Sequence, residues 1–151
     1  MSVIFEQLRL IVESFNRNEV EFALCGGLAV SAHGLIRATE DIDFLICEES
    51  LKRAYEAAAE VGYDIRGLDI SFKERTVEIR RISAVVDGEV ISLDLLLVTP
   101  HVEDVWLSRE HIDFMGLSLY VVSREGLIKM KQQSGRPQDL ADIDRLENET
   151  S

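Results

Sequence analysis

The sequence has few cysteines and histidines, no long apolar run and no concentration of basic residues. No apolar stretch approaches the roughly 18 residues needed to cross a bilayer, and no basic segment precedes an apolar one as in a secretory signal. We therefore expect no membrane contact and a cytoplasmic location. The two cysteines, Cys25 and Cys47, lie in apolar segments, and with three scattered histidines they provide no zinc-ligand spacing. Packed free thiols are the simpler interpretation.

The charge balance argues against a broad nucleic-acid-binding surface. The net charge is −12, acidic residues exceed basic ones in both halves, and neither an acidic tail nor a basic arm is present. This composition disfavours a tRNA or DNA substrate held by this chain alone, although a local basic site is compatible with an acidic whole. Hydrophobic residues make up 46% of the chain, which is ample for a folded core.

Patterning predicts one α/β (α+β) domain over residues 1–151, with a mixed central sheet flanked by helices, a core at about 20–122 and two C-terminal helices within 123–147. Helices are expected after a cap at Ser2, at 28–33, from a cap at Ser50 to Glu60, from Pro100 through Trp106, and at 125–133 and 137–146. Strands are expected at 20–24, 42–46, within 70–82 and at 90–98, with a hairpin at 112–122 that turns at Gly116.

Three aspartates occupy unusual positions in this pattern. Asp41 and Asp43 begin an apolar strand, and alternation along a strand directs both side chains to one face. Asp94 lies within the apolar run VISLDLLLV, where a charge is costly unless it is paired or metal-bound. Unrelated surface aspartates are the alternative, because D-x-D alone is a common pattern.

If the strands at 42–46 and 90–98 are neighbours, the three carboxylates share one patch. Two charges about 4 Å apart repel by roughly 4 kcal/mol at an effective dielectric near 20, so the cluster needs protons or cations. Hard oxygen ligands suit Mg²⁺, with Mn²⁺ as the alternative metal. Upstream, Gly26 and Gly27 follow a strand and open a helix, where backbone N–H groups can approach an anion. A simple tight turn is the competing interpretation of the glycine pair.

The segment GGLAVSAHGLIRATEDIDFLI resembles the signature of the polymerase-β-type nucleotidyltransferase superfamily: two small residues, about ten more, then D-x-D, with a third aspartate on a later strand, here Asp94. The wording R-x-T-x-D-I-D, with Arg37 and Thr39, is closer to the nucleotidyltransferase toxins of abortive-infection toxin–antitoxin systems and their relatives. The C-terminal LIKMKQQSGRPQDLADIDRLE is similar to the ending of that branch. The resemblance spans about residues 20–147.

Helical geometry separates the two lysines of the first C-terminal helix. With Leu127 at 0° and 100° per residue, Lys131 falls at 40°, within the apolar face, and Lys129 falls on the solvent side. Lys131 is either a triphosphate contact, as the resemblance implies, or a lysine that extends from the edge of the core. The resemblance makes Arg136 and Asp139 supports for Lys131 or the nucleotide, while helix capping is the other role for Asp139.

The resemblance implies Mg²⁺-dependent transfer of a nucleoside monophosphate from an NTP to a hydroxyl of a tRNA or protein, in a toxin-type enzyme that has an antitoxin partner. The expected catalytic and metal-binding residues are Asp41, Asp43 and Asp94; the expected nucleotide-binding residues are Gly26, Gly27, Arg37, Thr39, Lys131, Arg136 and Asp139. A catalytically silent nucleotide-sensing or partner-binding module of the same fold is the alternative.

Overall fold

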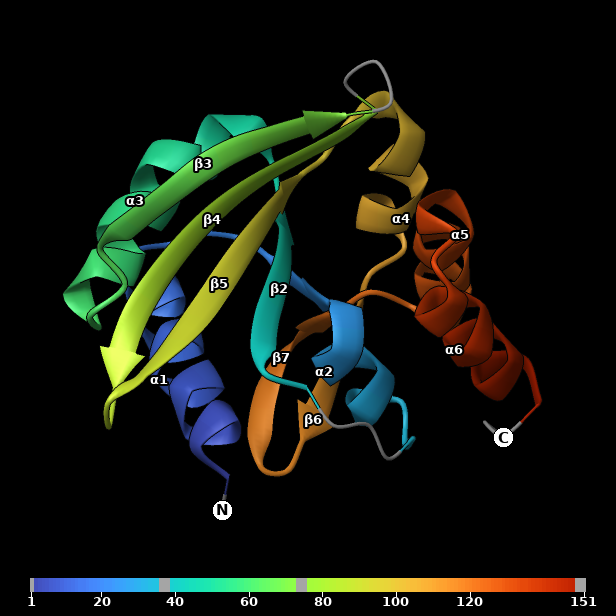
Figure 1. The fold of residues 1–151 in the computed structure, drawn as a ribbon, viewed down its shortest axis with the longest axis horizontal. Helices are drawn as coiled ribbons and strands as arrows, with labels where there is room; N and C mark the ends of the chain where they lie inside the picture. Colours follow the sequence, from blue (N-terminus) through green and yellow to red (C-terminus); the bar gives the residue numbers. More distant parts are fainter. Residues whose placement is uncertain (1, 36–38, 73–75, 149–151) are drawn as a thin grey trace.

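A computed structural model describes residues 2–35, 39–72 and 76–148, and within these ranges no helix is long and apolar enough to span a membrane. The described residues form one seven-stranded sheet in the order β3-β4-β5-β2-β1-β7-β6 (Figure 1). The strands are β1 (Ala23–Cys25), β2 (Asp41–Ile46), β3 (Ile65–Phe72), β4 (Val77–Val86), β5 (Glu89–Leu97), β6 (Glu110–Phe114) and β7 (Leu117–Val121). β2 pairs with β5 and β1 with β7 in parallel, and the other pairs are antiparallel. The mixed sheet confirms the predicted fold class.

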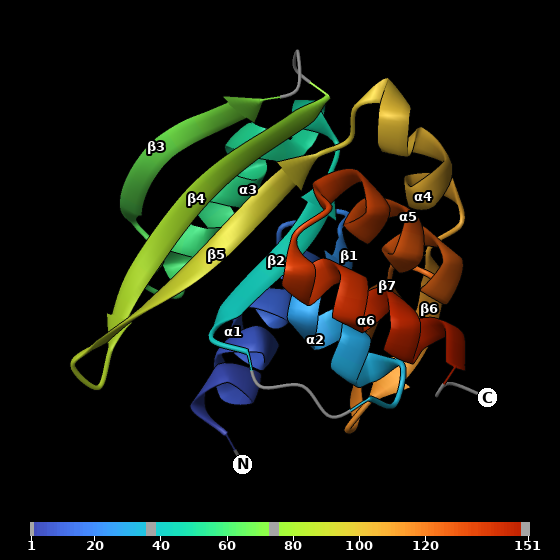
Figure 2. The same ribbon diagram turned by 45° about the vertical axis from the view of Figure 1, so that its right-hand side comes forward.

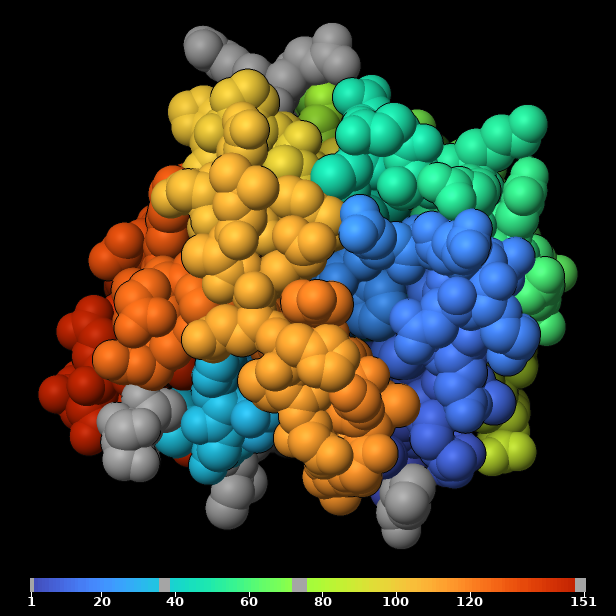
Figure 3. Space-filling model, turned by 180° about the vertical axis from the view of Figure 1, so that it is seen from behind, coloured from blue at the N-terminus to red at the C-terminus, as the bar shows by residue number. Residues whose placement is uncertain are grey.

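Helices cover the two sides of the sheet unequally. α1 (Val3–Arg17) and α3 (Leu51–Glu60) pack together behind the sheet, and Figure 3 shows both on that face. On the other side, α2 (Gly26–Ala32), α5 (Arg124–Ser134) and α6 (Pro137–Asn148) lie together near β1 and β2, while the front of β3–β5 carries no helix (Figure 2). α4 (Glu103–Leu107) follows a short 3₁₀ turn at Pro100–Val102. Residues of these strands, among them Arg81 on β4 and Asp94 on β5, line a cleft.

The first helix forms where its periodicity predicts it. Ser2 accepts a hydrogen bond from the Phe5 backbone N–H at 3.3 Å, which confirms the cap. The apolar stripe of α1 is buried, as are the back-facing residues of β2 and β5: Phe5, Leu8, Ile11, Val12, Phe15, Ile42, Phe44, Ile46, Leu93 and Leu95. This apolar layer fixes which face of β2 and β5 is left for charged residues.

Some predicted boundaries were wrong. The segment at 70–82 is not one strand: it holds the end of β3 and the start of β4, which pair antiparallel. Ile65 and Ile70 stay exposed on the edge strand, so the alternation that would have marked β3 is weak. Ser50 makes no side-chain cap, because a 3₁₀ turn at Glu48–Ser50 leads directly into α3.

Other boundaries shifted by a few residues. β1 covers only Ala23–Cys25, and α2 already begins at Gly26. The hairpin turning at Gly116 and the two C-terminal helices were predicted correctly. Cys25 and Cys47 are free thiols, the first buried and the second partly buried, as predicted.

Candidate active site

The parallel pairing of β2 with β5 brings the predicted carboxylates to one face. The register places Asp43 opposite Asp94 and Asp41 opposite Ser92. Because side chains alternate along a strand, Asp41 and Asp43 share a face, and Asp94 lies on the same face of the next strand. All three line a cleft of about 1560 Å³ that runs from the front of β3–β5 to the ends of α2 and α6.

Asp94 is paired, and its partner was missed by the sequence analysis. Arg81 on β4 donates from Nε to Oδ1 at 2.7 Å and from Nη2 to Oδ2 at 2.8 Å, so both carboxylate oxygens of Asp94 are bound. The Asp94 side chain is 10% exposed and that of Arg81 is 44% exposed. An ion pair therefore offsets the burial of Asp94 in the absence of a metal.

A signal for Arg81 was present in the sequence. Asp87 and Gly88 both have positive φ and form the two-residue turn between β4 and β5. An Asp-Gly pair at such a turn is a strong hairpin signal that fixes the register of the flanking strands. Counting back from the pair Val86–Glu89 places Arg81 opposite Asp94.

The environment of Asp43 disfavours the ionised form of its carboxyl group. Burial and the neighbouring charges of Asp94 and Asp41 raise the pKa of Asp43 from 3.8 to about 7, against smaller opposing effects of Lys131 and Arg81. Among the described residues none donates a hydrogen bond to its carboxylate. The Asp43 side chain thus has a charge that is incompletely compensated in this structure.

Gly26 makes the close approach of Asp43 possible. Its φ is +68°, and a Cβ built on it would overlap Oδ2 of Asp43. Gly26 and Gly27 begin α2 directly beside this carboxylate, as the glycine-pair interpretation expected. The glycine therefore has a steric function in addition to its turn geometry.

The oxygen donors of the cleft fit a hard divalent cation chemically, because Asp43 is an uncompensated carboxylate with two others on the same face. In the part of the chain that the structure describes, no group of three or more His, Cys, Asp or Glu side chains is already arranged as a metal site. The bidentate contact of Asp94 with Arg81 gives a physical reason, since the guanidinium takes both of its oxygens.

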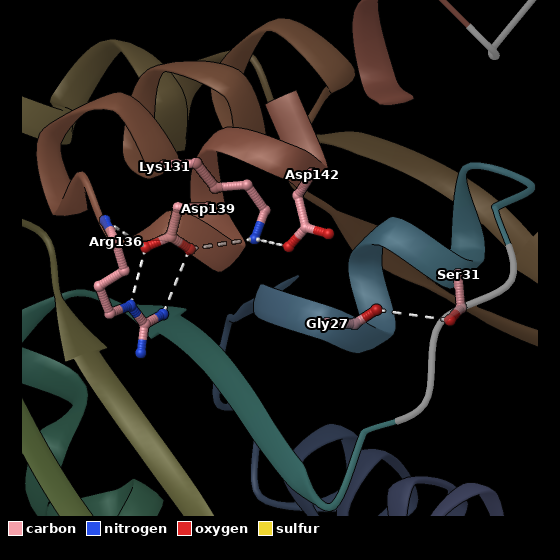
Figure 4. A network of polar contacts seen from close by, with 6 residues as sticks. All are labelled: Gly27, Ser31, Lys131, Arg136, Asp139 and Asp142. Carbon is pink, nitrogen blue, oxygen red and sulfur yellow. Dashed lines mark hydrogen bonds and ion pairs between the residues drawn. The ribbon is translucent and has the colours of Figure 1, made fainter. Parts of the chain in front are cut away.

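Lys131 on α5 and Asp139 and Asp142 on α6 form a buried network of polar contacts, and Arg136, between the two helices, joins it from the surface (Figure 4). Lys131 is 6% exposed and donates to Asp142 Oδ2 at 2.9 Å, with Asp139 Oδ1 at 3.6 Å. Arg136 contacts Asp139 through its backbone N–H and Nε, at 3.2 and 2.7 Å. Burial raises the pKa of Asp139, but hydrogen bonds from the side chains of Arg136 and Ser134 and the charges of Arg136 and Lys131 lower it to about 2. Asp139 thus lies between Lys131 and Arg136 and also caps α6, whereas Asp142, the hydrogen-bond partner of Lys131, was not predicted.

The helical phase of the two lysines is as predicted. Lys131 faces inward, whereas Lys129 lies at the surface and donates to both oxygens of Asp104 at 2.7 and 2.8 Å. Thr39 donates to the backbone carbonyl of Asp41 at 3.2 Å and lines the cleft. Arg37, the remaining expected nucleotide contact, lies outside the described residues.

Comparison with known protein families gives a match over nearly the whole chain. A family described as "Nucleotidyl transferase of unknown function" (DUF2204) matches residues 4–151. No curated protein matches the chain.

Solved structures share the fold at low identity. A nucleotidyltransferase-like protein from Thermotoga maritima (TM1012) is 16% identical, with a TM-score of 0.65 over 97% of this chain and 93% of that one. ANT(2″)-Ia, in complex with adenylyl-2″-tobramycin, is 13% identical, with a TM-score of 0.64 over 96% and 87%. The lincosamide antibiotic adenylyltransferase LnuA, bound to lincomycin, is 17% identical, with a TM-score of 0.62 over 95% and 96%.

Replacing Asp43 by Asn should change how stability depends on pH. A carboxyl whose pKa is raised to about 7 on folding contributes stability below its ordinary value of 3.8 and loses it as pH rises through 7. The metal-free wild type should therefore become less stable than Asp43→Asn between pH 4 and pH 8. Urea denaturation at several pH values measures this difference. If the free energy of unfolding depends on pH in the same way for both proteins, the pKa of Asp43 is not raised on folding.

Lys131→Met should destabilise the protein far more than Lys129→Met. Removing Lys131 leaves two buried carboxylates without this cation, a loss of about 3–5 kcal/mol by analogy with broken buried pairs, whereas exposed pairs contribute about 1 kcal/mol or less. The two substitutions are matched in chemistry and lie on the same helix. Equal midpoints in chemical denaturation would contradict the assigned network.

Proposed function

We propose that this chain, which belongs to the family of nucleotidyl transferases of unknown function, transfers a nucleoside monophosphate from an NTP to a hydroxyl group of an acceptor. The observation that carries the proposal is the pairing of Asp43 with Asp94 across parallel strands, next to the glycine pair that begins α2. Carboxylates on one face beside a backbone turn suit a metal-bound triphosphate.

The reaction follows from the groups that line the cleft. The acceptor hydroxyl oxygen attacks the α-phosphorus and forms a new P–O bond, while the bond to the oxygen bridging to the β-phosphate breaks and pyrophosphate leaves. Asp94 accepts the hydroxyl proton, a function that requires it to be ionised and near the acceptor. The negative charges of Asp41 and Asp43 would bind the cation that accompanies the nucleotide.

The metal assigned to this site is Mg²⁺, with Mn²⁺ as the alternative, and Asp41, Asp43 and Asp94 are its proposed ligands. When bound, it neutralises phosphate charge and orients the triphosphate. The raised pKa of Asp43, caused by burial and by the charges of Asp94 and Asp41, supports this assignment, because a divalent cation would offset the repulsion between these carboxylates.

The nucleotide side of the cleft is proposed to lie toward α2 and α6. Gly26 and Gly27 begin α2 at the cleft and carry backbone N–H groups, and Thr39 and Arg136 line the same cleft. Arg136 is the most exposed of the cleft cations, with a side chain 69% exposed, so its guanidinium can meet a phosphate while Asp139 anchors it. Lys131 acts by holding Asp139 and Asp142. Arg37 retains the role that the resemblance implies.

The charge of the cleft favours a neutral or cationic acceptor over a polyanionic one. Among the residues that the structure describes, its lining holds six carboxylates, namely Glu40, Asp41, Asp43, Glu78, Asp94 and Asp139, against three cations, Arg81, Lys131 and Arg136. Each of these cations is paired with an aspartate, which disfavours tRNA. We therefore favour a hydroxyl of a protein or of a small molecule; adenylyl-tobramycin and lincomycin in the similar structures are small hydroxylated examples.

The toxin role and an antitoxin partner remain proposals drawn from the sequence resemblance. A catalytically silent nucleotide-sensing module is the alternative function, favoured by one observation, the occupation of both Asp94 oxygens by Arg81. Turnover separates the two functions: incubation with each α-labelled NTP, Mg²⁺, and in turn cell protein, total tRNA and hydroxylated small molecules shows which acceptor becomes labelled.

Mg²⁺ together with an NTP should stabilise the protein more than Mg²⁺ alone, because the triphosphate completes the cation's ligands. At a nucleotide concentration of about 100 Kd the gain is about 2.7 kcal/mol. Asp43→Asn should lose the shift in melting temperature while retaining the apo fold. No shift at millimolar nucleotide, or an equal shift in the variant, would count against the site.

Asp94→Asn should bind Mg²⁺–NTP more weakly and lower the rate of transfer by roughly 10²–10⁴-fold, the usual contribution of a general base. The rate constant under saturating nucleotide measures the proton-accepting function separately from binding. Asp104→Asn, which removes a surface carboxylate that pairs with Lys129, is the control and should leave transfer unchanged. An active Asp94→Asn protein would overturn the assignment of the base.

A further inference from the structure

Arg81 is bound to a candidate catalytic carboxylate, yet it belongs to none of the residues that the proposed function uses. It lies on β4 directly opposite Asp94, and its fork-shaped guanidinium binds both oxygens of that carboxylate. Its side chain is nearly half exposed and lines the cleft that also contains Gly26, Gly27 and Arg136. The guanidinium is thus held at one end and has open cleft beside it.

Arg81 is a positive charge placed next to the three aspartates of the cleft. Asp43 lies beside Asp94 on the neighbouring strand, and Asp41 is on the same face two residues away. Arg81 therefore compensates part of the negative charge of these carboxylates, and a divalent cation would compete with it for Asp94.

We propose that Arg81 is a positioning residue that holds Asp94 in the resting site and gives it up when a metal–nucleotide complex binds. The inference rests on the proposed function, since it concerns the same carboxylates. A guanidinium and a divalent cation repel each other, so both cannot share the oxygens of Asp94 on equal terms. Once released, a planar guanidinium in the cleft matches the bidentate geometry of phosphate oxygens.

This exchange gives Arg81 two opposite effects, which a purely structural ion pair lacks. In the free protein Arg81 opposes metal binding, because it occupies Asp94 and adds a positive charge. In the nucleotide complex Arg81 favours binding, because its guanidinium moves to the triphosphate. The order of events is consequently fixed: metal arrives with the nucleotide, and Asp94 becomes available as a base only in that complex.

Direct Mn²⁺ binding to the nucleotide-free protein, followed by electron paramagnetic resonance of free Mn²⁺, tests the first effect. Arg81→Ala should bind Mn²⁺ about tenfold more tightly than the wild type, the scale of one charge-assisted hydrogen bond. Arg81→Lys should be intermediate, because it keeps the charge without the fork, and it serves if the alanine variant folds poorly. The same variants should bind Mg²⁺–NTP about tenfold more weakly.

Arg9→Ala is the matched control, since Arg9 also donates to both oxygens of one carboxylate, that of Glu6, but lies on α1 outside the cleft. It should change neither affinity. Mn²⁺ affinity that falls or stays constant in both Arg81 variants would overturn the inference, even where Asp43→Asn abolishes binding and the proposed function stands. If Mn²⁺ binds neither the wild type nor the Arg81 variants, the inference and the proposed metal site both fail.

Discussion

The parallel pairing of β2 with β5 is the constraint on which the rest of the site depends. It places Asp43 opposite Asp94 on adjacent strands, with Asp41 on the same face, and so concentrates like charge at the front of the sheet. Such a cluster persists only with compensation. Arg81 compensates the charge of Asp94. The raised pKa of Asp43 shows that burial and the charges of Asp94 and Asp41 still disfavour its ionised form.

The apolar core on the back of the sheet stabilises the strand register that brings the aspartates together. Ile42, Phe44 and Leu93 are fully buried on the back of the sheet, and the alternation of β-strands then fixes the aspartates on the opposite face. A slip of one residue in either strand would bury carboxylates in that core. The register that stabilises the protein is therefore the same register that assembles the site, and Gly26 allows α2 to begin against Asp43 without a steric clash.

The sequence predicted the fold class, most helices and the common face of Asp41 and Asp43, because these follow from local periodicity. It also gave the inward phase of Lys131 correctly. It did not predict the partner of Asp94, because a contact between β4 and β5 depends on the hairpin register, which the Asp87–Gly88 turn sets and local periodicity does not. β3 was merged with β4 because its edge position leaves Ile65 and Ile70 exposed and weakens alternation.

The cations of the cleft explain how an acidic protein can accommodate a triphosphate. Among the described residues that line it, Arg81, Lys131 and Arg136 each already contact an aspartate, so a phosphate gains a cation only by exchange or by sharing. Lys131 is buried and held by two carboxylates, which makes it the least able to exchange. Arg136 is exposed and can share its guanidinium with a phosphate, while Arg81 exchanges only if another cation takes its place at Asp94. In the proposed function, the binding of a nucleotide and the binding of its metal would therefore be coupled through the ion pairs of the resting protein, because carboxylates outnumber cations among the described residues of the cleft.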